Sequence, residues 1–353
     1  MDTDPERDLA QFKPADGQPS PAAPTTAPAR PMARPRPPRR ARAVLWRMFW
    51  FIVLAVLAGV VVYAVYIVNI VAKISTNSWQ LGPLAADASG RTNILVMGVG
   101  DPGHAGQNLS DTMMVLSLDG TAHRLAEISI PRDLRVNIEG YGYGKINTAN
   151  AYGGVSLAED TVSQTFDVPI DYYVKTNFSG LKEVVDAVGG LDVDVKDRLR
   201  DTEYPCDDDQ YKVCGLDIEP GSQHMDGTTV LQYVRCRKGT CGNDFGRAAR
   251  QQEVLGLLRP KVTDWHLILQ PAKLKQLVTA VQHGVETNMG IAQLLQLGNG
   301  VREAGANEPV NLVLSTANGG YLRGDPTGGS DLLPIGGDFS AISERVKNIF
   351  GAP

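Results

Sequence analysis

Histidine is scarce in this chain of 353 residues: there are five, scattered along the sequence and forming no pair. The sequence also lacks a GxSxG nucleophile elbow, an HExxH zinc helix and a complete Walker A loop. These absences argue against serine hydrolases, zinc hydrolases and P-loop NTPases that depend on such motifs. Catalytic groups must therefore come from another set of side chains.

Cysteine is rarer still, and its four copies fall in one short window, at Cys206, Cys214, Cys236 and Cys241. Outside the cytosol an even number of cysteines indicates disulfides. Three pairings are possible, and one of them, Cys206 with Cys214 and Cys236 with Cys241, closes two short loops. A zinc site is disfavoured because neither spacing is CxxC and only His224 lies nearby.

Net charge is also small, at −5, so composition gives no general case for nucleic-acid binding. Charge is nevertheless uneven: residues 1–29 are acidic, whereas residues 30–42 read RPMARPRPPRRAR. Neither segment can bury enough apolar surface to order itself, which predicts a disordered arm over 1–43. Because this arm contains no helix-turn-helix pattern, we expect no nucleic-acid partner and disfavour a membrane-bound transcription regulator.

One long run without charge follows the arm, from Met48 to Ala72. It is longer than the roughly 20 residues that a helix needs to cross a bilayer. Arginines precede the run, and Trp46 and Trp50 lie at the same end. This pattern predicts a transmembrane helix over 44–72, with a cytoplasmic N-terminus and everything beyond it outside, as in a single-pass protein of the cell membrane. A cleaved signal peptide fits less well, because its apolar core would be shorter and no small-residue cleavage site follows.

Beyond a predicted linker over 73–90, apolar runs of strand length alternate with helical patterns. Strands are expected at 93–99, 112–118, 124–130, 172–178, 191–195 and 310–314, and helices at 156–166, 178–188, 225–234, 245–258, 273–283, 291–301 and 340–350. Such alternation predicts an α/β fold: a three-layer α/β/α extracytoplasmic domain with a central mixed sheet. We expect this domain to occupy 91–353, with a core at 91–262 and a C-terminal extension at 263–353.

Several loops at predicted strand ends carry polar side chains. The stretch GVGDPG at 98–103 matches GxGxxG, but the next strand follows too soon for the helix that a dinucleotide site requires. The loop from Asp101 to Asp111 instead lies where α/β sheets place ligands. Arg132, in IPRD, follows another strand, and Lys145 ends the glycine-rich stretch GYGYGK.

The stretch from Arg235 to Gln252, RCRKGTCGNDFGRAARQQ, holds four arginines and a lysine against one aspartate. Asp244 is a suitable N-cap for the helix that follows. The spacing of Arg247, Arg250 and Gln251 places them on one face of that helix. Together with Arg235 and Arg237, they predict a basic pocket mouth for an anion. Phosphate suits such a cluster, and the carboxylates of Asp101 and Asp111 could then hold Mg²⁺ on its oxygens.

The order of these motifs resembles the LytR-CpsA-Psr family of membrane-anchored cell-wall glycopolymer ligases. The matching segments, from about residue 91 to about 258, are NILVMGVGD, SDTMMVLSLD, ISIPRDLRV, GKINTANAYGG, IDYYVKTNFSG, VDAVGGLDVDV, MDGTTVLQYVRCR and DFGRAARQQEVL. The resemblance implies a phosphotransferase. It would move a glycopolymer from a polyprenyl-pyrophosphate lipid of the membrane to a peptidoglycan hydroxyl.

The resemblance also implies roles for individual residues. Asp101 and Asp111 match the Mg²⁺-associated acids, and Arg132 matches the central pyrophosphate-binding arginine. Further phosphate contacts fall on Lys145, Arg235, Arg237 and Arg247, and Asp244 and Gln251 match positions that orient them. Either Asp111 or Asp244 could act as the base on the acceptor hydroxyl.

Two departures from the family pattern concern the donor site. Leu109 stands where many relatives carry an arginine, and GVGD has one glycine more than the usual GVD. The same pocket would also suit a polyprenyl-pyrophosphate pyrophosphatase, with water as the acceptor, or a non-catalytic protein that binds lipid or wall polymer. These alternatives stay open at the level of sequence.

Overall fold

The computed structural model of the protein describes residues 39–74, 82–103, 106–206, 211–242, 244–264, 266, 270–305, 307–317 and 319–351. Only the backbone is described for residues 39–49, 67–68, 70–74, 244, 271–272, 274, 278, 282–283 and 291. The predicted disordered arm lies outside the described residues up to residue 38, as does the stretch 75–81 of the predicted linker. The chain divides into two compact units, Met1–Gly59 and Val60–Pro353.

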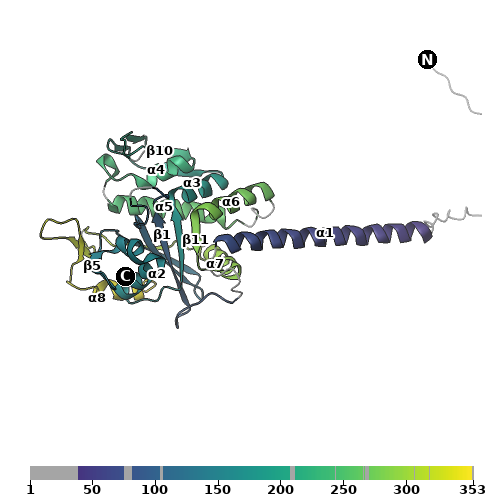
Figure 1. Cartoon of the computed structure of the whole chain (residues 1–353), viewed down its shortest axis with the longest axis horizontal. Helices are drawn as coiled ribbons and strands as arrows, with labels where there is room; N and C mark the ends of the chain where they lie inside the picture. The colour runs from purple at the N-terminus through teal and green to yellow at the C-terminus, as the bar shows by residue number, and fades with distance from the viewer. Residues whose placement is uncertain are drawn as a thin grey trace, which may run out of the picture. The chain divides into compact units, whose positions relative to one another are not determined.

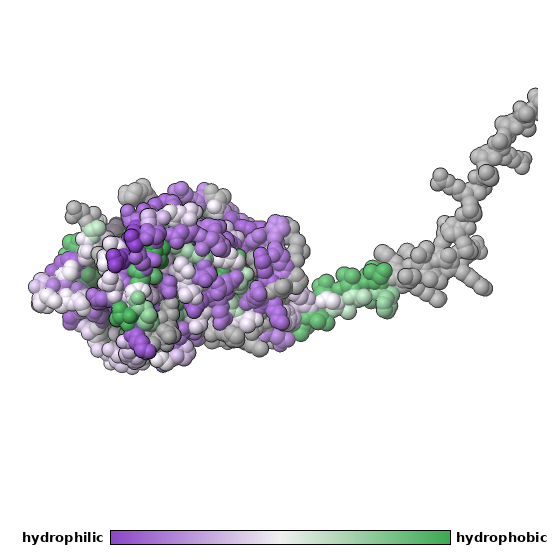
Figure 2. All heavy atoms as spheres, turned by 90° about the horizontal axis from the view of Figure 1, so that it is seen from above, coloured by the Kyte–Doolittle hydropathy of each residue, from purple (hydrophilic) through white to green (hydrophobic). Residues whose placement is uncertain are grey.

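The first helix, α1, runs from Arg39 to Ile74 (Figure 1). Its described side chains from Trp50 to Tyr66 carry no charge and are mostly exposed, and Figure 2 shows them as a hydrophobic stretch. Within the described part of the chain, no helix combines the length and the hydropathy needed to cross a membrane.

The centre of the second unit is a six-stranded mixed sheet with the order β11-β6-β1-β2-β3-β12. Its strands are β1 (Arg91–Val99), β2 (Thr112–Asp119), β3 (Arg124–Ile130), β6 (Tyr172–Asn177), β11 (Val285–Thr287) and β12 (Val310–Val313). β1 is parallel to β6 and β3 is parallel to β12, whereas the remaining neighbours are antiparallel. The ends of β1, β3, β6 and β12 therefore meet the starts of β2 and β11 at one edge of the sheet, the C-terminal edge.

Helices cover both faces of this sheet. One face packs with α2 (Ala149–Phe166) and α8 (Ser340–Lys347) around buried residues such as Leu95, Ile128 and Phe166. The other face packs with α7 (Ile291–Ala304) around Ile94 and its neighbours. Because both faces are buried, β1 and β2 contain nearly continuous apolar runs, ILVM and MMVL, rather than alternating patterns.

A second hydrophobic cluster joins α3 (Phe178–Ala187), α4 (Gly227–Arg235) and α5 (Asp244–Val262) to a small sheet of β7 (Leu191–Val195) and β10 (Gly221–Met225). α6 (Pro271–Gly284) packs so closely against α3 that a Cβ added to Gly284 would lie 2.1 Å from the Cα of Gly180. Three further two-stranded sheets pair β4 (Arg135–Ile138) with β5 (Gly142–Lys145), β8 (Leu199–Asp201) with β9 (Leu216–Ile218), and β13 (Leu322–Gly324) with β14 (Leu332–Pro334).

The structure confirms the predicted α/β fold with a central mixed sheet, but it corrects several details. α2 begins at Ala149 rather than 156, and the backbone at Gly153 and Gly154 is not helical, which interrupted the periodic pattern. The helix predicted from 225 begins at Gly227, since Met225 ends β10. β7 pairs with β10 and lies outside the main sheet.

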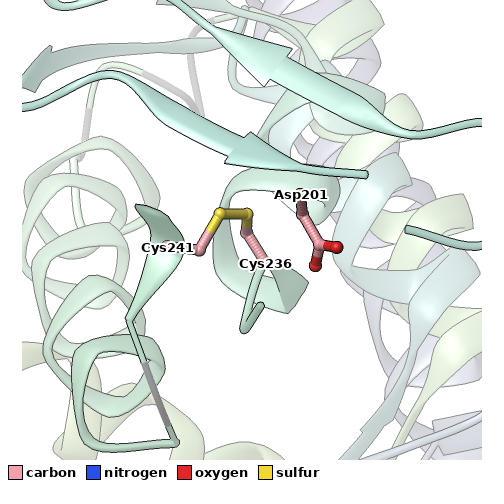
Figure 3. A group of neighbouring side chains, drawn as sticks. All are labelled: Asp201, Cys236 and Cys241. Atoms are coloured by element: carbon pink, nitrogen blue, oxygen red, sulfur yellow. A yellow bond between two sulfur atoms is a disulfide. The ribbon is translucent and has the colours of Figure 1, made fainter. Parts of the chain in front are cut away.

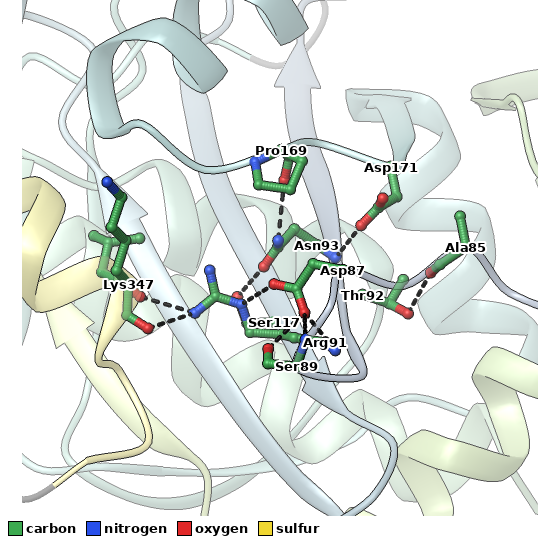
Figure 4. Close-up of polar contacts among 11 residues, drawn as sticks. Ala85, Asp87, Ser89, Arg91, Thr92, Asn93, Ser117, Pro169, Asp171 and Lys347 are labelled. Atoms are coloured by element: carbon green, nitrogen blue, oxygen red, sulfur yellow. Dashed lines mark hydrogen bonds and ion pairs between the residues drawn. The ribbon is translucent and has the colours of Figure 1, made fainter.

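A buried polar network joins the start of β1 to the C-terminal helix α8 (Figure 4). Arg91 is 6% exposed, and its Nη1 donates to the carbonyls of Val346 at 3.0 Å and Lys347 at 3.1 Å. Burial lowers the pKa of Arg91, and the nearby carboxylates of Asp87 and Asp171 act against that shift. The guanidinium therefore satisfies carbonyls at the end of a helix, where a positive charge is favoured.

Replacing Arg91 with methionine is expected to lower the free energy of unfolding by about 2–3 kcal/mol, because one buried and one partly buried carbonyl lose a charged donor. Denaturant unfolding followed by circular dichroism measures the change. The matched control is Lys347→Met, which removes an exposed ion pair with Asp167 and should change stability by less than about 1 kcal/mol. Equal effects of the two substitutions would contradict a specific role for Arg91.

Glu159, on α2, is half-buried, and this burial, with a smaller contribution from Asp160, raises its pKa to about 7. The folded protein therefore holds a proton on Glu159 that the unfolded chain has lost, and its stability falls as pH rises from about 4.5 towards 7. Glu159→Gln should leave the melting temperature nearly unchanged at pH 4 and raise it at pH 8. A difference between variant and wild type that does not depend on pH would contradict this assignment.

Candidate functional site at the edge of the sheet

A narrow cleft of about 20 Å³ opens at the C-terminal edge of the main sheet, between β2, β3, β12 and the start of α5. Its walls combine polar and apolar side chains. The lining residues are Asp111, Thr112, Met113, Ser129, Ile130, Pro131, Arg132, Phe245, Arg247, Ala248, Gln251, Val313 and Leu314. Four residues predicted from the sequence, Asp111, Arg132, Arg247 and Gln251, thus meet around one hollow.

The ion pair between Arg132 and Asp111 crosses this cleft. Nη1 of Arg132 donates to Oδ1 of Asp111 at 2.8 Å, and its Nε lies 3.6 Å from Oδ2 of Asp133. Lys145 reaches the same Asp133 from the end of β5, with Nζ to Oδ1 at 2.5 Å, and also contacts Ser330. Asp133 therefore links two predicted phosphate-binding cations.

The first turns of α5 supply the opposite wall of the cleft. Arg247 is 8% exposed, and its Nη2 donates to the backbone carbonyl of Asp111 at 3.3 Å. Gln251, one turn later, donates from Nε2 to Oγ1 of Thr112 at 2.8 Å. Next to it, buried Gln252 donates to Oγ of Ser129, which fixes α5 against β3. Two of these polar side chains of α5, Arg247 and Gln251, therefore contact the start of β2 and the residue just before it.

Other predicted residues lie outside the lining of this cleft. Asp101 accepts hydrogen bonds from the backbone nitrogen of Ser179 at 2.9 Å and from its hydroxyl at 3.0 Å, and so caps the start of α3. The guanidinium of Arg235 lies 4.3 Å from the ring centre of Phe178, and Arg237 is exposed. The side chain of Asp244 lies outside the described residues, although its backbone begins α5.

Arg250 faces away from the anion site that its spacing suggested. It is buried, and its guanidinium donates to three backbone carbonyls: Tyr233 at 2.9 Å, Cys241 at 2.9 Å and Cys236. Arg250 thus fastens α5 to the end of α4 and to the loop that carries Arg237. Side-chain periodicity could not reveal this role, because the acceptors are backbone groups of a loop.

A disulfide between Cys236 and Cys241 also closes this loop covalently. A second disulfide joins Cys206 to Cys214. Asp201 lies beside the disulfide between Cys236 and Cys241 (Figure 3). Its Oδ2 accepts a hydrogen bond from the backbone of Lys238 at 3.2 Å. Because disulfide sulfurs are not thiolates, this cluster is a structural brace rather than a zinc site.

Two residues of the site were missed by sequence reasoning. Asp133 follows Arg132 directly, and its role depends on the β4–β5 hairpin that returns Lys145 to it. Gln252 is adjacent to the predicted Gln251, yet it points to β3 rather than to the cleft mouth. A carboxylate beside an arginine was a usable signal for the first, whereas nothing in the sequence distinguished the two glutamines.

Comparison with known proteins gives a consistent result. Residues 67–324 match the family described as the LytR_cpsA_psr family. A polyisoprenyl-teichoic acid–peptidoglycan teichoic acid transferase, TagV of Bacillus subtilis, is 36% identical over 58% of this chain and 51% of its own length. TagU of Enterococcus faecalis is 31% identical over 60% of this chain and 66% of its own length. The chain thus spans about half to two thirds of these relatives.

Solved structures agree with the sequence relatives. The crystal structure of Bacillus subtilis TagV superposes with a TM-score of 0.59 at 27% identity, covering 75% of this chain and 99% of that one. A structure of TagT bound to LIIa-WTA gives a TM-score of 0.57 at 26% identity, covering 74% and 92%. The fold described above is therefore that of these proteins.

Replacing Arg250 with lysine is expected to destabilise the protein by about 3 kcal/mol, because one ammonium cannot reach three carbonyls that a planar guanidinium satisfies together. Chemical denaturation of the full chain tests this expectation. Arg200→Lys, at an exposed position on β8, is the control and should change stability by no more than about 0.5 kcal/mol. If Arg250→Lys were as stable as that control, the three hydrogen bonds would not hold the loop.

Proposed function

The chain belongs to the LytR-CpsA-Psr family, and we propose that it is a phosphotransferase that moves a glycopolymer from a polyprenyl-pyrophosphate lipid to a peptidoglycan hydroxyl. The observation that carries this proposal is the composition of the cleft. Arginine, glutamine and carboxylate groups meet at its polar side, whereas Met113, Phe245 and other apolar side chains form the remaining walls. A donor that joins a charged pyrophosphate to an apolar lipid has the matching chemistry.

The relatives support the same substrate class, because they are named as transferases of polyisoprenyl-linked teichoic acid to peptidoglycan. In the proposed reaction, the acceptor hydroxyl oxygen forms a bond to the phosphorus that carries the glycopolymer. The bond from that phosphorus to the bridging oxygen breaks, and polyprenyl monophosphate leaves. The hydroxyl proton passes to a carboxylate, Asp111 or Asp244.

Arg132 and Arg247 are proposed to stabilise the negative charge that grows on the phosphate oxygens. Both approach Asp111 in the free protein, one through its carboxylate and the other through its carbonyl. Lys145, Arg235, Arg237 and Gln251 would add contacts to the donor head group. Of these, Lys145 joins the cleft through Asp133, the carboxylate that it shares with Arg132.

Mg²⁺ is the proposed cofactor, and the donor set of this loop suits it. Among the described residues, Oδ2 of Asp111 accepts no hydrogen bond, whereas both oxygens of Asp101 already accept one from Ser179. Carboxylate oxygens are the ligands that a hard divalent cation prefers. Asp111, with Asp101 as the second ligand, would hold the ion, which supplies positive charge to the pyrophosphate oxygens.

We further propose that 44–72 anchors the protein in the cell membrane as a single span, with residues 91–353 outside the cell. The charge-free run Met48–Ala72 supports this, although only part of its side chains lies among the described residues. The two disulfides also favour an extracytoplasmic domain. An anchored domain would stay close to the bilayer that supplies its lipid-linked donor.

Arg132→Ala tests the donor chemistry, and it is expected to reduce turnover by about 10²–10³-fold, the usual effect of removing one transition-state donor. Release of polyprenyl monophosphate from a polyprenyl-pyrophosphate oligosaccharide would be followed with the full chain in nanodiscs, with Mg²⁺ or with EDTA. Peptidoglycan would be included in one arm and omitted from the other.

Arg323→Ala is the matched control, since Arg323 is exposed on β13 and away from the cleft lining. Release that requires Arg132, Mg²⁺ and peptidoglycan would support the transferase. Equal release without peptidoglycan would instead identify a pyrophosphatase. Retention of lipid with no release in any arm would mean that the protein binds its ligand without turnover.

A further inference from the structure

A second hollow, of about 380 Å³, opens at the same C-terminal edge of the sheet, beside β1, β6 and β11. It does not share a lining residue with the cleft described above. Its lining residues are Val99, Gly100, Pro102, Gln107, Asn108, Asn150, Lys175, Thr176, Asn177, Gly284, Val285 and Glu286. We call this hollow the amide pocket, because four of its lining side chains are carboxamides. Its volume is typical of a small-molecule site.

The carboxamides of the amide pocket keep part of their hydrogen-bonding capacity. Asn177 accepts from Gly180 through Oδ1, and Gln107 accepts from Gly103 through Oε1, which leaves the NH₂ group of each. Asn150 is 8% exposed and donates to the carbonyl of Asn108, which leaves its own Oδ1. Among the described residues, the side chain of Asn108 makes no hydrogen bond. The walls therefore offer both donors and acceptors.

The pocket carries little net charge. Its lining contains one cation and one anion, and these pair with each other: Nζ of Lys175 lies 2.5 Å from Oε2 of Glu286. The other oxygen of Glu286 accepts from the hydroxyl of Tyr173 at 3.2 Å. Such walls suit a neutral ligand with many hydroxyl or amide groups. They suit neither a phosphate, which would need an available cation, nor a lipid tail, which would need continuous apolar walls.

One loop contributes lining residues to both the amide pocket and the cleft. The loop after β1 contributes Gln107 and Asn108 to the pocket, and only three residues further on it contributes Asp111 to the cleft. Two hydrogen bonds hold this loop in place. The backbone nitrogen of Ser110 donates to the carbonyl of Asn147, and the carbonyl of Asn108 accepts from the side chain of Asn150. One loop therefore connects the amide pocket to the residue whose carboxylate pairs with Arg132.

We propose that the amide pocket binds neutral sugar residues of the acceptor glycan and brings their hydroxyl to the cleft. This proposal rests on the proposed function, since it assigns the second substrate of the same reaction. Each N-acetylated sugar presents hydroxyls together with an acetamido group, and these match carboxamides that both donate and accept. The donor's pyrophosphate and lipid match the other hollow, so the two substrates occupy different parts of one sheet edge.

Asn108→Ala tests the proposal, because Asn108 is exposed and its replacement leaves the fold intact. In the full chain in nanodiscs, with saturating polyprenyl-pyrophosphate oligosaccharide, the variant should raise KM for peptidoglycan oligosaccharides about five- to tenfold. KM for the donor should stay unchanged. Asn108→Trp, which fills the pocket, should raise KM for the acceptor further. Asn311→Ala, an exposed carboxamide on the opposite edge strand β12, should behave as wild type.

Direct titration with a tetramer of N-acetylglucosamine separates this proposal from the proposed function, because it needs no turnover. Binding that Asn108→Trp abolishes and Asn311→Ala preserves would support the pocket, even if no transfer occurred and the proposed function failed. Tetramer binding that is absent, or that is insensitive to Asn108→Trp, would overturn the proposal. A rise in KM for the donor rather than for the acceptor would overturn it as well, by assigning the pocket to the donor's sugar.

Discussion

The geometry of the candidate site depends on how its charges are compensated before a ligand arrives. Arginines cannot stay buried at an edge of a sheet without partners, because ordering and desolvating them costs free energy. Arg132 pairs with Asp111, Arg247 donates to the carbonyl of that same residue, and Lys145 pairs with Asp133. These partners hold each cation within reach of the cleft, where the phosphate oxygens of the proposed donor would replace them.

α5 joins this charged region to the rest of the domain. Its cleft-facing side chains, Arg247 and Gln251, alternate with inward ones, Arg250 and Gln252. Arg250 donates to backbone carbonyls and Gln252 donates to Ser129, and these bonds fix the orientation of α5. Arg247 and Gln251 are therefore held in position at the cleft. A helix that presented only ligand-binding groups would have nothing to set its rotation against the sheet.

Much of this arrangement could be predicted from the sequence, because the dominant signals are local. Continuous apolar runs gave the buried strands, and helical spacing gave α3, α5 and α7. Motifs at strand ends identified Asp111, just before β2, and Arg132, just after β3, which the antiparallel pairing of these two strands brings to one edge. The sequence did not predict the inward orientation of Arg250, because its partners are backbone carbonyls. It did not predict the pairing of Lys145 with Asp133 either, because a hairpin brings the two residues together. The placement of β7 outside the main sheet depended likewise on β10, a polar strand with no alternating pattern.

The two edge strands of the sheet, β11 and β12, complete the walls of both hollows. Val313 and Leu314, at the end of β12, form a wall of the cleft, and the start of β11 forms a wall of the amide pocket. Both strands come from the last quarter of the chain, whereas the arginine cluster is made earlier. A nascent chain that has emerged only as far as α5 carries every predicted phosphate-binding side chain but neither complete hollow. Both hollows are therefore complete only once the last quarter of the chain has added its two strands to the sheet.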